Sequence, residues 1–196
     1  TWWLGLRVEL VTNPITGAPL NLSPAVSFFA TVIWLVSIPN VVNLADGMDG
    51  LAGGIGLFLC LTLGVVGLLS PFHQGLAVLS FGLAGAMAAF LIFNFPPARI
   101  FLGDGGAYFL GFYIASASLG SSQKSYIGAS LAITLIALGL PLLDTLIAFG
   151  RRTLKGVPVM RGDSEHIHHR LLLTGMSSGR ALFILYGIFL TLSILA

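Results

Sequence analysis

Residues 40–50 read NVVNLADGMDG and lie between two apolar runs, residues 24–39 and 51–69. Asp46 and Asp49 stand three positions apart in this segment, and each is followed by glycine. A helix that crosses a bilayer needs about 20 mostly apolar residues. Carboxylates inside or beside such helices are costly and mark functional sites by default. The pattern therefore predicts a membrane protein with a polar, functional turn between its first two helices.

The composition of the whole chain agrees with a membrane protein. Of its 196 residues, 56% are hydrophobic and 8% are charged, whereas soluble domains carry about 25% charged residues. The net charge of +2 is too small to argue for nucleic acid. The single cysteine, Cys60, lies inside an apolar run, so neither a disulfide framework nor a zinc-finger spacing is available.

Six apolar stretches predict an all-α polytopic membrane protein with about six transmembrane helices: residues 24–39, 51–69, 75–93, 105–119, 127–149 and 182–196. Before them, alternating residues 6–10 and the turn-forming residues 13–17 predict a small extracytoplasmic β-hairpin. The chain does not begin with Met, and its last apolar run continues to Ala196. We therefore expect residues 1–196 to be a single integral membrane domain, the C-terminal portion of a longer protein whose upstream helices precede Thr1.

The distribution of basic residues predicts the orientation of these helices. If each run crosses once, residues 40–50, 94–104 and 150–181 emerge on one side and hold seven basic residues. The segments on the other side hold only Arg7 and Lys124. The positive-inside rule makes the first side cytoplasmic. Because Asp46, Asp49 and Asp104 also lie there, we expect an active site on the cytoplasmic face of the plasma membrane.

The first polar block contains Asn40, Asn43, Asp46 and Asp49. Steps of three residues would place all four near one face if the segment were helical. The structural alternative is a helix end and a glycine turn, with Asp49 as the N-cap of the helix that begins at Leu51. That alternative explains Asp49 but leaves Asp46 and the asparagines without a role.

The second block, residues 94–106, reads NFPPARIFLGDGG. Asp104 at a helix start can serve as an N-cap alone, or it can present its carboxylate and nearby backbone N–H groups to Mg²⁺ and phosphate. The block is not a P-loop, because GxxxxGK[ST] is absent.

The third block, HIHHR at residues 166–170, follows four basic residues, Arg151, Arg152, Lys155 and Arg161. The basic surroundings disfavour zinc and favour a phosphate-rich ligand. The alternative is a loop that binds lipid headgroups, which would explain the arginines but not the clustered histidines. Asp144, inside the fifth apolar run, is either a partner for a cytoplasmic arginine or a catalytic residue.

Together and in this order, the blocks resemble the polyprenyl-phosphate N-acetylhexosamine-1-phosphate transferases, the WecA/TagO/MraY family. The matching stretches are NVVNLADGMDGLAGG, FNFPPARIFLGDGGAYFLG, PLLDTL and SEHIHHRLL. The HIHH form is more similar to the WecA/TagO branch, which uses UDP-N-acetylglucosamine (UDP-GlcNAc), than to the muramoyl-pentapeptide branch with its usual histidine triplet.

The resemblance implies transfer of N-acetylhexosamine 1-phosphate, GlcNAc 1-phosphate in this branch, from a UDP-sugar to polyprenyl (undecaprenyl) phosphate, with release of UMP. This would be the first membrane step of a cell-envelope polysaccharide. The expected cofactor is Mg²⁺, with Mn²⁺ as an alternative. The expected partners are a UDP-N-acetylhexosamine, polyprenyl phosphate and the lipid bilayer; nucleic acid is not expected, and a homodimer is left open.

The resemblance also assigns roles to residues. It implies catalytic roles for Asp46, Asp49 and Asp104, and it places Mg²⁺ on Asp104, with Asn43 as a second candidate ligand. The substrate-binding set is Asn43, Asn94, Phe101, Arg161, His166, His168, His169 and Arg170.

One feature of the family is missing, because nothing before Asp46 supplies its paired-aspartate motif; we expect that motif upstream of Thr1. The functional alternatives are a phospho-N-acetylmuramoyl-pentapeptide transferase and, more remotely, an intramembrane prenyltransferase, a CDP-alcohol phosphotransferase or a transporter. The two other enzyme classes would need different Asp motifs, and neither predicts the histidine block. A transporter predicts acids near helix midpoints, whereas these acids cluster at the ends of the apolar runs.

Overall fold

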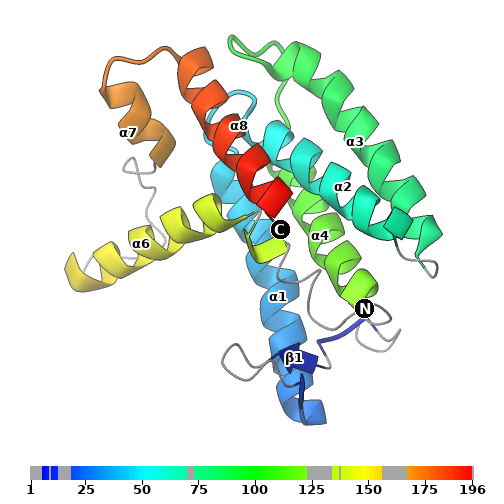
Figure 1. The fold of residues 1–196 in the computed structure, drawn as a ribbon. Coiled ribbons are helices and arrows are strands. Elements are labelled where there is room, and N and C mark those ends of the chain that lie inside the picture. Colours follow the sequence, from blue (N-terminus) through cyan, green and yellow to red (C-terminus); the bar gives the residue numbers. More distant parts are fainter. Residues whose placement is uncertain are drawn as a thin grey trace.

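The computed structural model describes residues 6–8, 10–12, 19–69, 73–122, 134–136, 138–155 and 167–195. In chain order its elements are β1 (Leu10–Thr12), β2 (Pro19–Asn21), α1 (Pro24–Ala45), α2 (Leu51–Leu69), α3 (Gln74–Asn94), α4 (Gly103–Ser122), α6 (Gly139–Lys155), α7 (Ile167–Leu173) and α8 (Ser178–Leu195). Figure 1 shows the helices packed as a bundle, with the short strands beside the start of α1. The described part of the chain is therefore mainly helical, as the sequence predicts.

Helix α1 begins with Pro24 in its first turn, where the missing N–H and fixed φ of proline are tolerated. It then continues through Pro39 to Ala45, six residues beyond the predicted end. Pro39 is buried, and a Cβ built on Gly111 of α4 would lie 2.5 Å from the Pro39 Cα atom. The close packing of α4 against this turn, which the sequence pattern does not reveal, accompanies the helical continuation.

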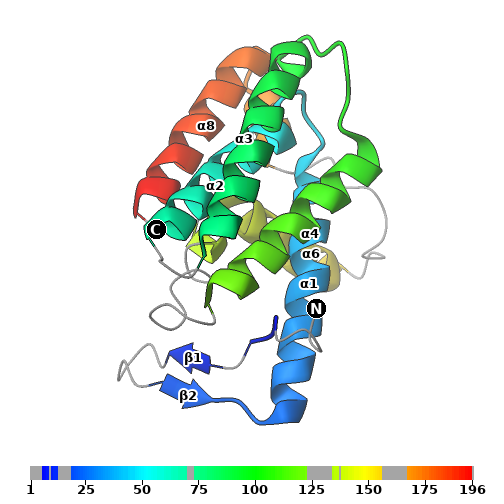
Figure 2. The ribbon, with the colours of Figure 1, turned by 90° about the vertical axis from the view of Figure 1, so that its right-hand side faces the viewer.

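Helix α2 lies at the centre of the bundle. In the most apolar 18-residue window of each helix, 61% of α2 is buried, against 33% of α1 and 17% of α3. Figure 2 shows α2 between α8 and α3. The outer helices expose large apolar side chains, such as Val78 and Ile92 of α3 at 73% and 75%. A face of this kind is stable in hydrocarbon but not in water.

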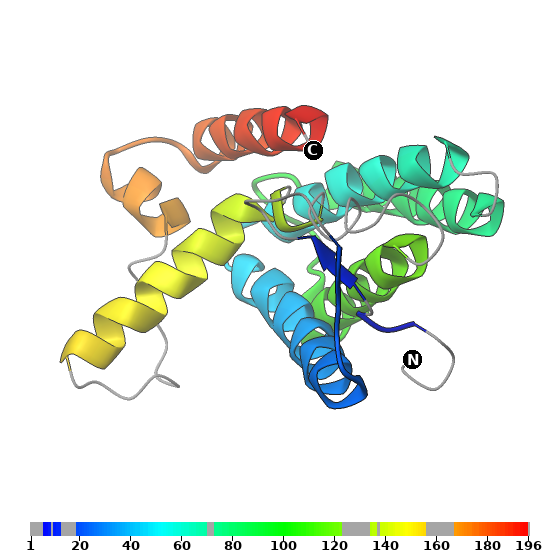
Figure 3. The same cartoon turned by 60° about the horizontal axis from the view of Figure 1, so that its bottom comes forward.

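Three described helices, α1, α2 and α3, are long and apolar enough to cross a membrane, and α8 contains a shorter apolar helix, Ser178–Ile194. These helices confirm the all-α membrane class; the number of six crossings stays a prediction. The predicted stretch 127–149 lies partly outside the described residues. Within its described part, helix α6 extends to Lys155 and points away from the rest of the bundle (Figures 1 and 3).

The two strands pair antiparallel, with Leu10 opposite Asn21 and Thr12 opposite Pro19. They lie at the end of the bundle where α1 begins (Figure 2). The backbone N–H of Val8 donates to the Thr31 hydroxyl at 3.0 Å, and that hydroxyl donates to the Ser27 carbonyl at 2.7 Å. These bonds attach the chain before the strands to the first turns of α1.

Candidate active site

Two loops lie against each other at one end of the bundle: residues 46–50, which hold Asp46 and Asp49, and residues 95–102, which lead to Asp104. We call them the first and second carboxylate loops. The Asp49 carboxylate accepts a hydrogen bond from the Ala98 backbone N–H at 3.0 Å. Asn94, the last residue of α3 and only 4% exposed, accepts from the Gly50 N–H at 3.0 Å and donates to the Ile100 carbonyl at 2.8 Å. Asp49 and Asn94 therefore connect the two loops through backbone groups that would otherwise lack partners.

Glycine at two turns makes these loops feasible. Gly50 has φ +79° and Gly103 has φ +67°, in the left-handed region that other residues rarely adopt. Around Gly50 there is also no room for a side chain, because an added Cβ would meet the Leu182 side chain at 2.7 Å. The Gly50 carbonyl accepts from the Tyr186 hydroxyl of α8 at 2.5 Å. The first loop is consequently fixed from two sides, by α8 and by the second loop.

Asp46, Asn43 and Asp104 form the polar centre of this end. Asn43, in the last turn of α1, donates its side-chain N–H to Asp104 Oδ1 at 3.0 Å. Asp46 follows α1 as its C-cap and is half-buried, whereas Asp104 is exposed in the first turn of α4. The pKa of Asp46 is raised to about 6, chiefly by burial and then by the negative charge of Asp104, against the lowering effect of the Gly103 N–H.

Two causes raise the pKa of Asp46: its burial and the negative charge of Asp104. Burial and a neighbouring carboxylate both disfavour the ionised form of Asp46, and a cation between the two acids would reverse that effect. Within the described residues, no group of three or more His, Cys, Asp or Glu side chains comes together. Mg²⁺ does not need such a cage, since it binds through one or two carboxylates plus substrate phosphates and water. The carboxylates of Asp104 and Asp46 fit that donor set. Asn43 contacts Asp104 through its side-chain N–H.

Beside the acids, the second loop exposes an aromatic ring. Phe101 is 74% exposed and lies three residues before Asp104. An exposed ring on a short loop offers a flat face on which a planar base can stack. Arg99 is also exposed on this loop, and its backbone N–H donates to the Phe93 carbonyl at 2.8 Å.

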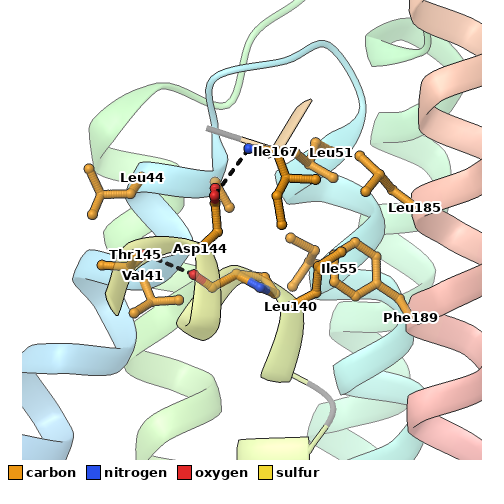
Figure 4. A pocket seen from close by; sticks show the side chains of 12 residues that line it. Val41, Leu44, Leu51, Ile55, Leu140, Asp144, Thr145, Ile167, Leu185 and Phe189 are labelled. Carbon is orange, nitrogen blue, oxygen red and sulfur yellow. Dashed lines mark hydrogen bonds between the residues drawn. The ribbon is translucent and has the colours of Figure 1, made fainter. Parts of the chain in front are cut away.

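The histidine block is described in part. Arg161 and His166 lie outside the described residues. Positions 168 and 169 follow the first residue of α7, although the structure describes only their backbone, and Arg170 is exposed. The N–H of Ile167 donates to Asp144 Oδ1 of α6 at 3.1 Å. Asp144 and Ile167 both line a mostly apolar pocket (Figure 4). Residues on both sides of the first carboxylate loop line it too, among them Leu44, Ala45 and Leu51.

The structure thus brings Asn43, Asp46, Asp49, Asn94, Phe101 and Asp104 to one end of the bundle, and the pocket places the start of α7 near the first of their two loops. Two contacts were not foreseen from the sequence, the Tyr186 hydroxyl on Gly50 and the Asp144 carboxylate on α7. The available signal for Tyr186 was its hydroxyl within an apolar helix, because a buried tyrosine usually finds a hydrogen-bond partner.

Comparison with known proteins agrees with this arrangement. Residues 1–122 match the model of the family described as Glycosyl transferase family 4. A Bacillus subtilis protein named "Probable undecaprenyl-phosphate N-acetylglucosaminyl 1-phosphate transferase" is 37% identical over 98% of this chain and 53% of its own length. The decaprenyl-phosphate N-acetylglucosaminephosphotransferase of Mycolicibacterium smegmatis is 38% identical, over 93% of this chain and 50% of its own.

A third relative is named for the first functional alternative given in the sequence analysis. The phospho-N-acetylmuramoyl-pentapeptide-transferase of Symbiobacterium thermophilum is 32% identical over 94% of this chain and 53% of its own length. The chain spans about half the length of the curated relatives it matches. The family match covers more than half of the chain, and the chain therefore belongs to glycosyl transferase family 4.

Proposed function

We propose that the protein containing this chain transfers N-acetylglucosamine 1-phosphate from UDP-GlcNAc to a polyprenyl phosphate in the plasma membrane. An oxygen of the lipid phosphate would attack the sugar-bearing β-phosphorus of the donor. The bond from that phosphorus to the bridging oxygen would break, so that the products are polyprenyl-diphosphate-GlcNAc and UMP. Family membership and the names of the relatives that are 37% and 38% identical support this reaction.

The observation that carries the proposal is the convergence of Asp46, Asp104 and Asn43 at the ends of apolar helices. The side-chain N–H of Asn43 donates to Asp104 Oδ1 at 3.0 Å, and the negative charge of Asp104 helps to raise the pKa of Asp46. The donor is a water-soluble nucleotide, whereas the acceptor is a membrane lipid. A polar site at the end of a membrane bundle is the place where both can react. By the positive-inside rule this end is cytoplasmic in a bundle of six crossings.

We assign the cofactor Mg²⁺, or alternatively Mn²⁺, to Asp104, with Asp46 beside it. When bound, the ion would supply positive charge that offsets repulsion between the two phosphate groups. Asn43 would then orient the Asp104 carboxylate through its N–H. Asp49 would have an indirect role, because its carboxylate holds the second loop in place through Ala98.

The remaining groups would bind the nucleotide sugar. The exposed ring of Phe101 would stack on uracil, and Asn94 would support it by holding the backbone of both carboxylate loops, at Gly50 and at Ile100. Arg170, Arg161, His166, His168 and His169 belong to the basic block that we assign to the diphosphate. Imidazole and guanidinium groups neutralise phosphate by charge-assisted hydrogen bonds.

A product assay with donors labelled in the sugar tests the proposal. Full-length protein in detergent would receive polyprenyl phosphate, Mg²⁺ and either UDP-GlcNAc, UDP-N-acetylgalactosamine or UDP-N-acetylmuramoyl-pentapeptide. We expect butanol-extractable label from UDP-GlcNAc, abolished by EDTA and restored by Mg²⁺. Label from the pentapeptide donor alone would identify the other branch, and the absence of lipid-linked label from every donor would refute the proposal.

A further inference from the structure

A carboxylate of α6 binds the N-terminal end of α7 across 23 residues of sequence: Asp144 Oδ1 accepts the Ile167 N–H at 3.1 Å. We propose that Asp144 is a positioning residue of the nucleotide-sugar site, which fixes α7 through this N–H and thereby places positions 168 and 169. The inference rests on the proposed function, since that function assigns the histidines to the nucleotide sugar. Figure 4 shows the bond between the two elements.

The surroundings of Asp144 give this hydrogen bond its importance. The pocket around it is apolar except for Asp144 and Thr145. The Thr145 hydroxyl donates to the Pro141 carbonyl at 2.8 Å, within its own helix. A carboxylate placed among apolar side chains requires hydrogen-bond donors to compensate for the lost water, and the Ile167 N–H of α7 is one such donor. The bond itself is partly buried.

Helix α7 depends on such an anchor because it has only 7 residues. An isolated helix of two turns is unstable, since nucleation costs more than so few hydrogen bonds return. Its apolar residues Ile167, Leu171 and Leu172 pack against the core, and Gly175, with φ +85°, ends it through an N–H bond to the Leu172 carbonyl at 3.0 Å. Apolar contacts select the face that is buried, whereas a directional hydrogen bond fixes the position along the helix axis.

The anchor also relates α7 to the carboxylate loop. Leu44 and Ala45 precede Asp46 by two residues or fewer, and Leu51 follows Gly50; all three line the same pocket as Asp144 and Ile167. Figure 4 shows the end of α1 and the start of α2 on either side of that pocket. Positions 168 and 169 come directly after the anchored residue. Loss of the anchor should consequently move them relative to Asp46 while the carboxylate loops, held by Asn94, stay in place.

Two pairs of variants in the full-length protein separate the hydrogen bond from other properties of these residues. Asp144→Leu removes the acceptor, whereas Asp144→Asn removes the charge but keeps an oxygen at the same place. Ile167→Pro removes the donor at the first helical position, where proline is tolerated, whereas Ile167→Ala keeps the donor and removes most of the side chain. Thr145→Val is the control for the neighbouring position, because its hydrogen bond is local to α6.

We expect Asp144→Leu and Ile167→Pro each to raise the KM for UDP-GlcNAc by about tenfold, the factor that corresponds to a lost helix cap. The KM for polyprenyl phosphate should change by less than about twofold. Asp144→Asn, Ile167→Ala and Thr145→Val should stay within about threefold of wild type. The double variant Asp144→Leu/Ile167→Pro should be no worse than either single one, because both remove the same bond.

Hydrogen–deuterium exchange tests the hydrogen bond between Asp144 and α7 independently of enzyme activity. Peptides covering residues 167–173 should exchange faster in Asp144→Leu and Ile167→Pro but not in Asp144→Asn, and peptides of α2 should be unchanged. Unchanged exchange in α7 would overturn the proposal. So would an Asp144→Asn variant that behaves like Asp144→Leu, because the charge of Asp144 rather than its hydrogen-bond acceptor would then matter. Faster exchange with an unchanged KM would establish the anchor and overturn the assignment of α7 to the nucleotide, which belongs to the proposed function.

Discussion

Replacing Asp104 by asparagine separates its structural role from its chemical one. The variant keeps the shape of the side chain, and its carboxamide oxygen can still accept the N–H of Asn43, which lies 3.0 Å from Oδ1 in the wild type. Loss of a negative charge in the first turn of α4 costs about 0.3–1 kcal/mol. Relief of the repulsion that raises the Asp46 pKa acts in the opposite direction. We therefore expect nearly unchanged stability.

Activity should respond very differently. Loss of one electrostatic contact to the transition state costs about 3–4 kcal/mol, or two to three decades in rate, and a direct metal ligand should cost at least that. We predict that Asp104→Asn lowers the initial rate of lipid-linked product at least about a hundredfold, and that excess Mg²⁺ does not restore it. The rate would be measured with the full-length protein at saturating concentrations of both substrates.

Tyr108→Phe is the matched control for Asp104→Asn. Tyr108 lies one turn further along α4, is exposed, and its hydroxyl donates to Asn40 at 3.5 Å, so its loss should leave the rate within about twofold. The melting temperatures of both variants should stay near that of the wild type. If Asp104→Asn keeps more than about a tenth of the wild-type rate, Asp104 has only a structural role in the first turn of α4, and the metal must be sought at Asp46 or Asp49.

Three other predictions concern the framework around the site. Asn94→Leu should destabilise the protein by about 2–5 kcal/mol, since it leaves the Gly50 N–H and the Ile100 carbonyl without partners; a thermal melt of the purified protein that matches wild type would contradict this. Gly111→Ala should cost about 1–3 kcal/mol by forcing α4 away from α1, whereas Gly82→Ala, where a Cβ meets nothing within 4 Å, should not lower the melting temperature. With Cys60 replaced, a new cysteine within residues 70–74 should react with an impermeant thiol reagent outside intact cells, and one at position 156 should not; the reverse pattern would overturn the predicted orientation.

The sequence predicts helices well where the apolar run is uninterrupted. Residues 51–69 form α2 within the predicted bounds, because a long apolar run between two polar turns leaves little alternative. The end predicted for the first helix was too early, since Pro39 is usually a helix breaker. The packing of Gly111 against Pro39 depends on a residue 72 positions later, which a local pattern does not contain.

The candidate site shows the same division between local and long-range information. The parity of the apolar runs predicted that the acids of two segments lie on the same side of the membrane, and the bond from Asn43 to Asp104 joins two helix ends that are 61 residues apart. The suggestion that Asp49 shares a helix face with Asn43 does not apply, because α1 ends at Ala45. The contacts of Asp49 and Asn94 with backbone groups depend on the meeting of two loops, and no spacing in the sequence encodes them.

The claim that the phosphate travels with the sugar can be tested by one measurement, the fate of the β-phosphorus of UDP-GlcNAc. Full-length protein would be incubated with polyprenyl phosphate, Mg²⁺ and donor labelled with ³²P at the β position, followed by separation of lipid and aqueous products. We predict label in the lipid fraction, in equal amount to the UMP released, and no labelled UDP. Labelled UDP in the aqueous phase beside a lipid product without ³²P would show transfer of the sugar alone and would contradict the reaction proposed for the Asp46–Asp104 site.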